Sequence, residues 1–282
     1  MEDPAGRINF GGFVGLSTVD WPGRSVCTIF LRGCPLRCSY CHNLSIQAGR
    51  EFLDIAEVME MVDSAGPLIS GVVISGGEPT LQRDAVIELA RRIKALGLAV
   101  GIQTNGYFPA TLESLLSERL LDRVALDYKT RWEGFSKRWE GYGAVCTDDY
   151  TTQVRRSIEL CTAAWDRGIL EEFEVVLTIF AGNEHEALEV ARSLPVGVPL
   201  VLNQGIMKRT REDRAPGANG APRPRSREEE KGWQRPLTLA ELKALADQIS
   251  RKRGITKIRT REEGEKVYES DRGRWAAGER KR

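Results

Sequence analysis

The chain alternates short apolar runs with amphipathic helical patterns, and this alternation restricts its fold more than any other feature. The patterns predict six strands: Val26–Leu31, Gly71–Ile74, Ala99–Gln103, Val124–Leu126, Phe173–Ile179 and Pro199–Leu202. Strands that alternate with helices favour parallel βαβ units with right-handed crossovers. Six units fall short of the eight of a closed barrel. We therefore predict an α/β fold, a partial (β/α)6 TIM-like barrel of parallel strands with a C-terminal helical and strand extension.

Helical periodicity fills the connections between these strands. Asp54 is a candidate N-cap for the first helix. The predicted helices are Ile55–Val62, Leu81–Leu96, one after Pro109, Thr152–Trp165 and Glu184–Ser193.

Composition divides the chain into three parts. Residues 1–207 carry the barrel pattern, 208–236 form a basic Pro/Gly/Arg-rich stretch, and 237–282 form a C-terminal extension with a helix to about Arg253 and a strand at Ile255–Ile258. The middle stretch cannot build a core, so its composition predicts a disordered linker. Because no nucleic-acid-binding motif accompanies its basic residues, we expect no nucleic-acid partner.

The charge balance excludes several classes of partner. The 282 residues include 41 Lys+Arg and 40 Asp+Glu, for a net charge of +1. This balance gives no reason to expect binding to nucleic acid or to an anionic membrane. No run approaches 18 apolar residues, and the acidic N-terminus lacks a secretory signal. We expect a cytoplasmic protein without a membrane partner, whose cysteines stay reduced.

Six cysteines stand at positions 27, 34, 38, 41, 146 and 161. Cys27 lies in an apolar run and Cys161 in a helical pattern, so both are interpreted as small buried hydrophobes. Cys146 lies in a polar loop and has no assigned role. The remaining three, Cys34, Cys38 and Cys41, fall within eight residues.

This cysteine cluster does not match the usual metal motifs. A structural zinc site takes four ligands, normally as two separated pairs, and only His42 is near. A complete ferredoxin-type site takes four cysteines. Three thiolates on one loop instead favour a cubane [4Fe–4S] cluster with one iron open to a ligand. A zinc site and unligated thiols remain the alternatives.

Polar motifs follow the ends of four predicted strands. They are the cysteine loop, Gly76-Gly77-Glu78, Thr104-Asn105 and Asp127-Tyr128-Lys129. Loops after the carboxyl ends of parallel strands meet on one face, so we expect the four motifs to share a rim. The alternative is that Gly, Asn and Asp only terminate the strands.

Each motif suggests a contact and has a plainer interpretation. Gly76 and Gly77 allow close backbone approach to a ligand, and the Glu78 carboxylate suits a ligand ammonium group. Pro79 would begin a helix whose amides favour anions. Together these residues could also be a simple strand-to-helix turn with an exposed acid.

Three further side chains are candidates for the rim. Tyr40 could present its ring to a purine or fill the loop. Asp127 and Lys129 could contact a carboxylate, a hydroxyl pair or a cation, or form a surface ion pair.

At this point the sequence resembles a known family. The motif Cys34-x-x-x-Cys38-x-Tyr40-Cys41, together with Gly76-Gly77-Glu78, resembles the radical S-adenosylmethionine (SAM) superfamily. Over Gly11–Gly205 the chain is similar to the activating enzymes of glycyl radical proteins, and most of all to those of anaerobic ribonucleoside-triphosphate reductase. The further motifs that carry this likeness are Leu16–Gly23, Phe30–Cys34, Cys41-His42-Asn43, Thr104-Asn105-Gly106 and Asp127-Tyr128-Lys129.

The resemblance implies a mechanism. The three cysteines would hold three irons of a [4Fe–4S] cluster, and SAM would chelate the fourth through its amino and carboxylate groups. One electron, from a donor such as flavodoxin or ferredoxin, would cleave SAM to methionine and a 5′-deoxyadenosyl radical. That radical would take a hydrogen from a glycine of a partner glycyl radical enzyme, under anaerobic conditions.

The resemblance also implies roles for individual residues. Gly76, Gly77 and Glu78 would face the SAM amino group, and Tyr40 would lie against adenine. Asp127 would belong to the carboxylate region. Three more residues complete the expected SAM site: Thr104, Asn105 and Lys129. No side chain is expected to be catalytic by itself.

Two positions depart from the family pattern. Gln103 stands where relatives with a cation beside SAM often carry an acid, and Glu174 stands where many carry an arginine. Asn203 and Gln204 are candidates for the rim without an assigned role.

Two other functions compete with the activase. One is radical SAM chemistry on a small molecule, as in deazapurine synthesis, although the chain has no second cysteine group. The other is a non-enzymatic iron–sulfur or zinc protein.

The connection between Lys129 and Thr151 is rich in aromatic residues. We expect it either to contact the partner enzyme or to cover the barrel. It contains Trp132, Phe135, Trp139, Tyr142 and Tyr150.

Overall fold

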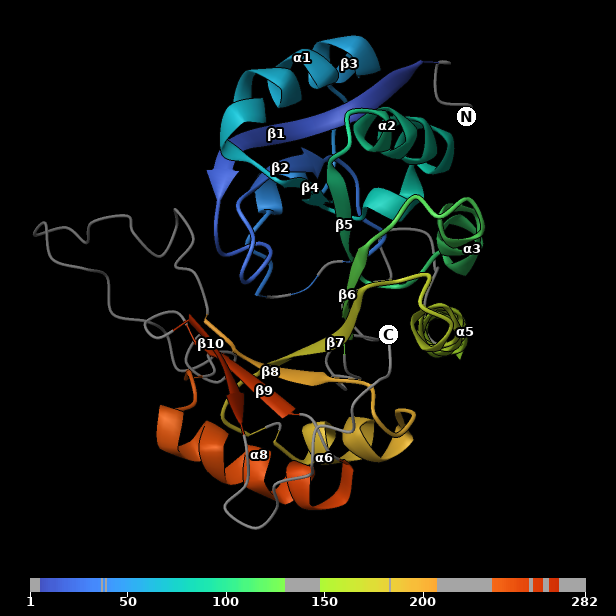
Figure 1. Ribbon diagram of the computed structural model, residues 1–282. Coiled ribbons are helices and arrows are strands. Elements are labelled where there is room, and N and C mark those ends of the chain that lie inside the picture. Colours follow the sequence, from blue (N-terminus) through green and yellow to red (C-terminus); the bar gives the residue numbers. More distant parts are fainter. Residues whose placement is uncertain are drawn as a thin grey trace, which may run out of the picture.

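The structure is a computed structural model that describes residues 6–36, 38, 40–129, 148–182, 184–206, 235–253, 256–260 and 264–268. One sheet of ten strands runs through it in the order β10-β9-β8-β7-β6-β5-β4-β2-β1-β3 (Figure 1). The strands are β1 (Arg7–Ser17), β2 (Val26–Leu31), β3 (Phe52–Asp54), β4 (Gly71–Gly76), β5 (Ala99–Thr104), β6 (Arg123–Asp127), β7 (Glu172–Ile179), β8 (Leu200–Gln204), β9 (Thr256–Thr260) and β10 (Gly264–Tyr268). The helices are α1 (Ile55–Ala65), α2 (Arg83–Ala95), α3 (Pro109–Ser117), α5 (Asp148–Asp166), α6 (Glu184–Ser193) and α8 (Leu239–Arg253).

The predicted α/β partial barrel is confirmed. Strands β2, β4, β5, β6, β7, β8 and β9 pair in parallel, each with the next. Strands β1, β3 and β10 add antiparallel pairs at the two edges. The parallel part has one strand more than predicted, because β9 from the C-terminal extension pairs with β8. The helices lie outside the curved sheet in Figure 1.

Local sequence signals explain where the helices begin. Asp54 caps α1 as predicted, and the Glu57 carboxylate accepts the Asp54 backbone N–H at 2.9 Å, which completes a capping box. Pro79 begins a helical segment as expected, but this segment is short. Residues Pro79–Leu81 form one short 3₁₀ turn, and α2 starts only at Arg83.

The side of the sheet that faces the barrel interior is layered. Successive strand residues point to opposite sides, so residues two apart share a side. Ala125, Val176 and Val201 form one apolar cluster on the inner side, and Trp21, Val26 and Val73 form another. Two residues beyond Val73, Gly101, Ala125, Val176 and Val201 come polar side chains, which we call the polar layer: Ser75, Gln103, Asp127, Thr178 and Asn203.

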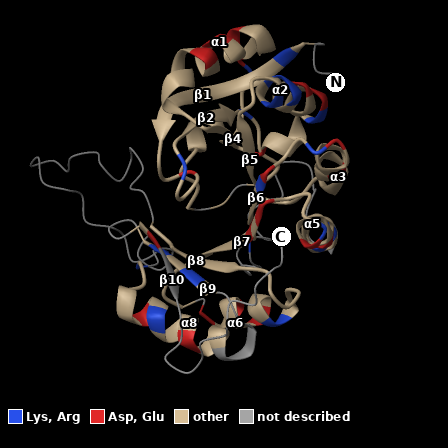
Figure 2. Cartoon of the chain, viewed as in Figure 1, with Lys and Arg blue, Asp and Glu red and all other residues tan. Residues whose placement is uncertain are grey.

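Charged residues precede the apolar cluster of Ala125, Val176 and Val201, on the side opposite to the polar layer. Arg123 Nη2, Lys257 Nζ and Arg259 Nη2 contact the Glu174 carboxylate at 2.6, 3.1 and 2.9 Å. Burial alone would raise the pKa of Glu174, but these three cations lower it to about 2. Glu174 therefore lies in this ion-pair network and not at the rim. Figure 2 shows acidic and basic segments together on the strands of this region.

Trp21 occupies the interior between β2, β4 and β5. Its ring is fully buried, and a Cβ added at Gly101 would lie 2.9 Å from it, so only glycine fits there. Its Nε1 donates to Glu172 Oε1 at 3.0 Å. Gln103 Nε2 and Arg123 Nη1 both donate to the carbonyl of the preceding Asp20, at 3.2 and 3.0 Å. These contacts fix the segment after β1 inside the barrel.

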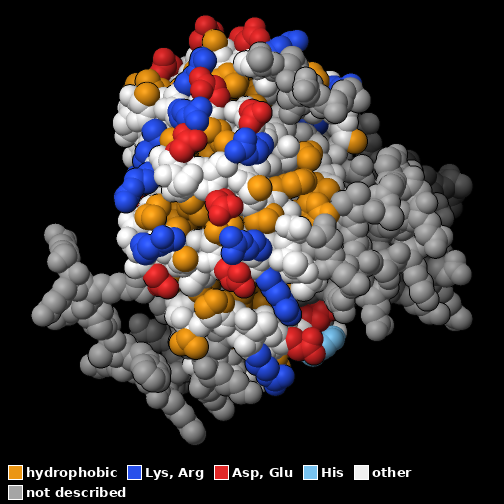
Figure 3. All heavy atoms as spheres, turned by 90° about the vertical axis from the view of Figure 1, so that its right-hand side faces the viewer, with side chains coloured by type: hydrophobic (Ala, Val, Ile, Leu, Met, Phe, Trp, Pro, Cys, Tyr) orange, Lys and Arg blue, Asp and Glu red, His pale blue; other side chains and the backbone are white. Residues whose placement is uncertain are grey.

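Some predicted segments lie outside the described residues. They include the basic stretch 208–236 except for its last two residues, most of the aromatic connection, and Cys146. Of the helices that are described, none is both long and apolar enough to span a membrane. The face in Figure 3 carries acidic and basic side chains interspersed, without a patch of one sign.

Candidate functional site

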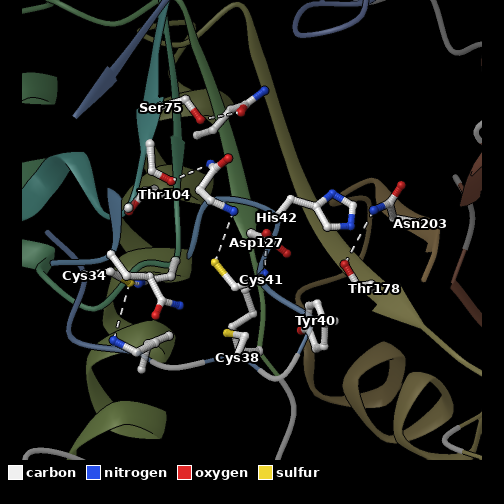
Figure 4. A pocket seen from close by; sticks show the side chains of 18 of the residues that line it. Cys34, Cys38, Tyr40, Cys41, His42, Ser75, Thr104, Asp127, Thr178 and Asn203 are labelled. Carbon is white, nitrogen blue, oxygen red and sulfur yellow. Dashed lines mark hydrogen bonds and ion pairs between the residues drawn. The ribbon is translucent and has the colours of Figure 1, made fainter. Parts of the chain in front are cut away.

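A cavity of about 230 Å³ opens at the carboxyl ends of the parallel strands. It is far larger than the roughly 30 Å³ that one water molecule occupies. Ten of the eleven predicted site residues line it, and Glu78 does not (Figure 4). The ten are Cys34, Cys38, Tyr40, Cys41, Gly76, Gly77, Thr104, Asn105, Asp127 and Lys129. The expectation that separate loops share one rim therefore holds in the geometry.

The three cysteines are reduced and half-buried on the loop after β2. The backbone N–H of Leu36 donates to Cys34 Sγ and that of Asn43 to Cys41 Sγ, both at 3.4 Å. Such N–H···S bonds are among the contacts that tune cluster-ligating thiolates. Within the described ranges, no three His, Cys, Asp or Glu side chains are gathered closely enough to hold one metal ion. A cubane needs no such approach, since each thiolate binds a different iron, so the donor set fits a cluster.

Without a metal the thiols of Cys34 and Cys38 hold their protons. Burial raises the pKa of Cys34 to about 12, and the charge of Glu78 adds to the effect. Burial raises the pKa of Cys38 to about 11, although Lys129 opposes it. Metal binding must therefore displace protons from this loop.

Gly76 and Gly77 are required by the contact between β4 and the cysteine loop. A Cβ at Gly76 would lie 2.2 Å from the Leu31 carbonyl oxygen, and one at Gly77 would lie 2.2 Å from that of Gly33. The close approach lets Gly77 N donate to Leu31 O at 2.8 Å and Glu78 N to Gly33 O at 2.7 Å. Both glycines also line the cavity, so a ligand there meets their backbone.

The structure corrects the interpretation of Glu78. Its side chain is fully buried and outside the cavity, so its carboxylate is not available to a ligand ammonium group. It accepts bonds from Thr80 N at 3.0 Å, Thr104 Oγ1 at 2.7 Å and Asn105 N at 2.7 Å, and also from the Thr80 hydroxyl. Burial raises its pKa, and these bonds oppose the shift. Glu78 thus ties the ends of β4 and β5 together.

Tyr40, Asp127 and Lys129 form one group on the cavity wall. Lys129 Nζ contacts Asp127 Oδ2 at 2.5 Å and lies 5.3 Å from the centre of the Tyr40 ring. Burial opposes the charge of Lys129, yet the Asp127 carboxylate holds its pKa well above the ordinary value. The ring of Tyr40 also packs against Phe180, with 5.3 Å between the centroids. The ion pair is therefore present, and both of its members also line the cavity, so a ligand contact by Asp127 or Lys129 stays a prediction.

The cavity wall also contains residues that the sequence patterns did not single out, and others to which they gave no role. Ser75 Oγ donates to Gln103 Oε1 at 2.7 Å, and Asn203 Nδ2 donates to Thr178 Oγ1 at 3.5 Å. His42 Nε2 lies 3.0 Å from the Ile206 carbonyl oxygen, which joins the cysteine loop to the end of β8. Ser75 and Thr178 could have been found from strand alternation, because each follows a buried inward residue by two positions.

Comparisons with known proteins agree with this geometry. A Methanocaldococcus jannaschii protein provisionally named a glycyl-radical enzyme activating enzyme is 38% identical over 154 residues, 53% of this chain and 61% of that protein. The pyruvate formate-lyase-activating enzyme of Clostridium pasteurianum is 35% identical over 156 residues, 53% of this chain and 63% of that enzyme. The chain thus spans about three fifths of the length of these two relatives.

Other matches are shorter or show the fold alone. The 7-carboxy-7-deazaguanine synthase of Methanospirillum hungatei is 44% identical over 87 residues, 29% of this chain and 35% of that enzyme. The structure of TYW1 with a lysine-pyruvate adduct bound has a TM-score of 0.51 at 12% identity and covers 86% of this chain and 79% of that one. A likeness at this identity supports the fold only.

The family follows from a match over most of the barrel. The sequence model of the radical SAM superfamily matches residues 28–192, which is more than half of the chain and includes the three clustered cysteines. The superfamily uses a [4Fe–4S] cluster and SAM, in agreement with the predicted cofactors. The chain belongs to the radical SAM superfamily.

Proposed function

We propose that the protein is an activating enzyme that generates a glycyl radical on a partner enzyme. The observation that carries the proposal is the meeting of Cys34, Cys38 and Cys41 with Gly76 and Gly77 in one open cavity. The relatives named as activating enzymes, at 38% and 35% identity, support the same chemistry. As the partner we propose anaerobic ribonucleoside-triphosphate reductase, with flavodoxin or ferredoxin as the electron donor.

The residues of the chain have distinct tasks in this reaction. The three thiolates would hold the cluster, and the backbone of Gly76 and Gly77 would face the SAM amino group. Tyr40 would lie against adenine, and Asp127 with Lys129 would belong to the carboxylate region. Bound there, the cluster and SAM would supply the radical chemistry, and the chain would hold them so that hydrogen abstraction is directed to a glycine of the partner. The protein contributes binding, orientation and exclusion of competing reactions.

A matched pair of cysteine variants tests the proposal. We expect Cys38→Ala to lose the cluster and SAM cleavage, because it removes one of three iron ligands. Cys161→Ala serves as the control, since this fully buried cysteine lies in α5, away from the cavity. The measurements are iron and sulfide per chain, 5′-deoxyadenosine formed under dithionite, and the glycyl radical doublet by electron paramagnetic resonance. Full SAM cleavage by Cys38→Ala would refute the ligand assignment.

The match to a 7-carboxy-7-deazaguanine synthase favours one second candidate, radical chemistry on a small molecule. The two functions separate in a mixing experiment with reduced protein, SAM and either candidate glycyl radical enzymes or the small-molecule substrate of a 7-carboxy-7-deazaguanine synthase. A doublet on a protein partner supports the activase. Turnover of the small molecule without any doublet supports the second candidate.

A further inference from the structure

The wall formed by β7 and β8 carries a pair of neutral polar side chains. Val176 and Val201 belong to the inner apolar cluster, and Thr178 and Asn203 follow them by two residues. Thr178 and Asn203 are also register partners in the parallel pairing of the two strands. Alternation therefore places both side chains on the inner side, and both line the cavity. In Figure 4 they lie across the cavity from Cys34.

The hydrogen bond between them orients the Asn203 amide. Asn203 Nδ2 donates to Thr178 Oγ1 at 3.5 Å. In the described part of the chain the Asn203 side chain makes no other hydrogen bond, and it is half-buried. The bond uses the amide nitrogen as donor and leaves Oδ1 as an acceptor on a side chain that lines the cavity. An N–H group of a bound molecule is the matching partner.

The charges around the cavity select the class of molecule. Among the described lining residues, the charged side chains are those of Asp127 and Lys129, which pair with each other, besides the titratable His42. Asp127 and Lys129 are already assigned to SAM, and a second anionic group would normally need a further unpaired arginine or lysine, which the described lining residues do not include. A polypeptide main chain is uncharged and offers both N–H and C=O groups. It therefore matches a wall built from amides and hydroxyls.

We propose that Asn203, held in place by Thr178, accepts a hydrogen bond from a main-chain N–H of the substrate polypeptide next to the reacting glycine. This inference rests on the proposed function and deepens it, because it assigns the polypeptide subsite. Fixing a main-chain amide beside glycine orders the glycine Cα relative to the reacting group, and such positioning is a large source of rate. Because the main chain is the same for every sequence, recognition at this point is independent of the neighbouring side chains.

An N-methyl scan of a peptide substrate tests the hydrogen bond. The probes are uncharged 15-residue peptides with one central glycine, each N-methylated at one position near it, added to the cluster-loaded full-length protein with SAM and dithionite. We expect one position at which methylation raises the half-saturating peptide concentration about fivefold to tenfold, the loss typical of one hydrogen bond. In Asn203→Ala, the half-saturating concentration of the unmodified peptide should rise by the same factor. Methylation at that one position should then cause no further rise.

Two more variants complete the design. Thr178→Val keeps the side-chain shape and removes the hydroxyl, so it should reproduce part of the Asn203→Ala effect and raise the number of SAM molecules cleaved per glycyl radical. Val196→Thr, at a site with 88% exposure, is the control and should behave as the wild type does.

The outcomes distinguish this inference from the proposed function. Equal sensitivity of wild type and Asn203→Ala to methylation at every position would overturn the assignment of Asn203 and leave the activase intact. A changed SAM affinity in Asn203→Ala, with unchanged peptide dependence, would overturn it as well. Wild-type protein that cleaves SAM but forms no radical on any glycine peptide or partner would refute the activase and the subsite together.

Discussion

The contact between the cysteine loop and β4 makes Gly77→Ala the most informative single substitution. The new Cβ would lie 2.2 Å from the Gly33 carbonyl oxygen and 3.2 Å from Cys34 Cβ, where ordinary contact begins at 3.4 Å. The two segments must therefore separate by about 1 Å. The neighbours in contact are backbone atoms and the Cβ of a cluster cysteine, so no flexible side chain can give way.

The separation has a cost that follows from the structure. It disrupts the bonds from Gly77 N to Leu31 O and from Glu78 N to Gly33 O, each about 1 kcal/mol net. Overpacking typically adds about 1–3 kcal/mol. We expect Gly77→Ala to lower the free energy of unfolding by roughly 3–5 kcal/mol and to reduce cluster content, because the loop that carries Cys34 moves.

The assay compares two glycine variants. Gly66→Ala is the matched control, since Gly66 has helical backbone angles and a Cβ there would meet nothing within 4 Å. It should leave stability unchanged or raise it by up to about 1 kcal/mol. Urea unfolding followed by circular dichroism gives the free energies, and iron and sulfide per chain give the cluster content. Stability within about 1 kcal/mol of wild type and full iron content in Gly77→Ala would contradict the steric reasoning.

Three further substitutions test other parts of the structure. Glu174 has a pKa of about 2 against an ordinary 4.5, so its ion pairs contribute roughly 3 kcal/mol above pH 4.5 that is lost as the pH falls toward 2. In Glu174→Gln, the free energy of unfolding should not show this loss between pH 4.5 and 2. If its free energy of unfolding fell with pH as steeply as that of the wild type, the result would argue against the network. Trp21→Ala should cost about 3–5 kcal/mol in urea unfolding, because it empties a fully buried site, and a cost below about 1 kcal/mol would contradict its packing role. Glu78→Gln should lower thermal stability, since its amide nitrogen replaces one carboxylate oxygen and cannot accept the bonds which that oxygen receives, either from Thr80 and Thr104 or from Asn105. Weaker SAM binding at unchanged stability would restore a ligand role for this carboxylate.

Several elements of the fold were readable from local sequence. The six predicted parallel strands and the capping box of α1 follow from short-range patterns, since alternation and N-cap chemistry act within a few residues. Strand β1 was not predicted. Its eleven residues include three glycines and exposed Val14 and Leu16, so the sequence shows no clear alternation. The antiparallel pairing with β2, and not a local sequence pattern, stabilises β1 as a strand.

The candidate site divides in the same way. The spacing of Cys34, Cys38 and Cys41 indicated a shared function without any structure, because ligands on one short loop are bound to be near one another. The direction of the Glu78 side chain was not predictable, since it depends on donors from Thr80, Thr104 and Asn105. Thr104 and Asn105 come from a neighbouring strand more than twenty residues away.

The sequence by itself determined the alternating strand and helix pattern, the family and the close spacing of the three clustered cysteines, because each is encoded within a short window. Only the tertiary structure decided that β9 joins the barrel, that the two glycines serve the contact between β4 and the cysteine loop, and that Thr178 and Asn203 face the cavity as a pair. These features depend on strand register and on the approach of segments far apart in the chain. Burial and hydrogen bonding between such segments are properties of the folded sheet, and no local pattern carries them.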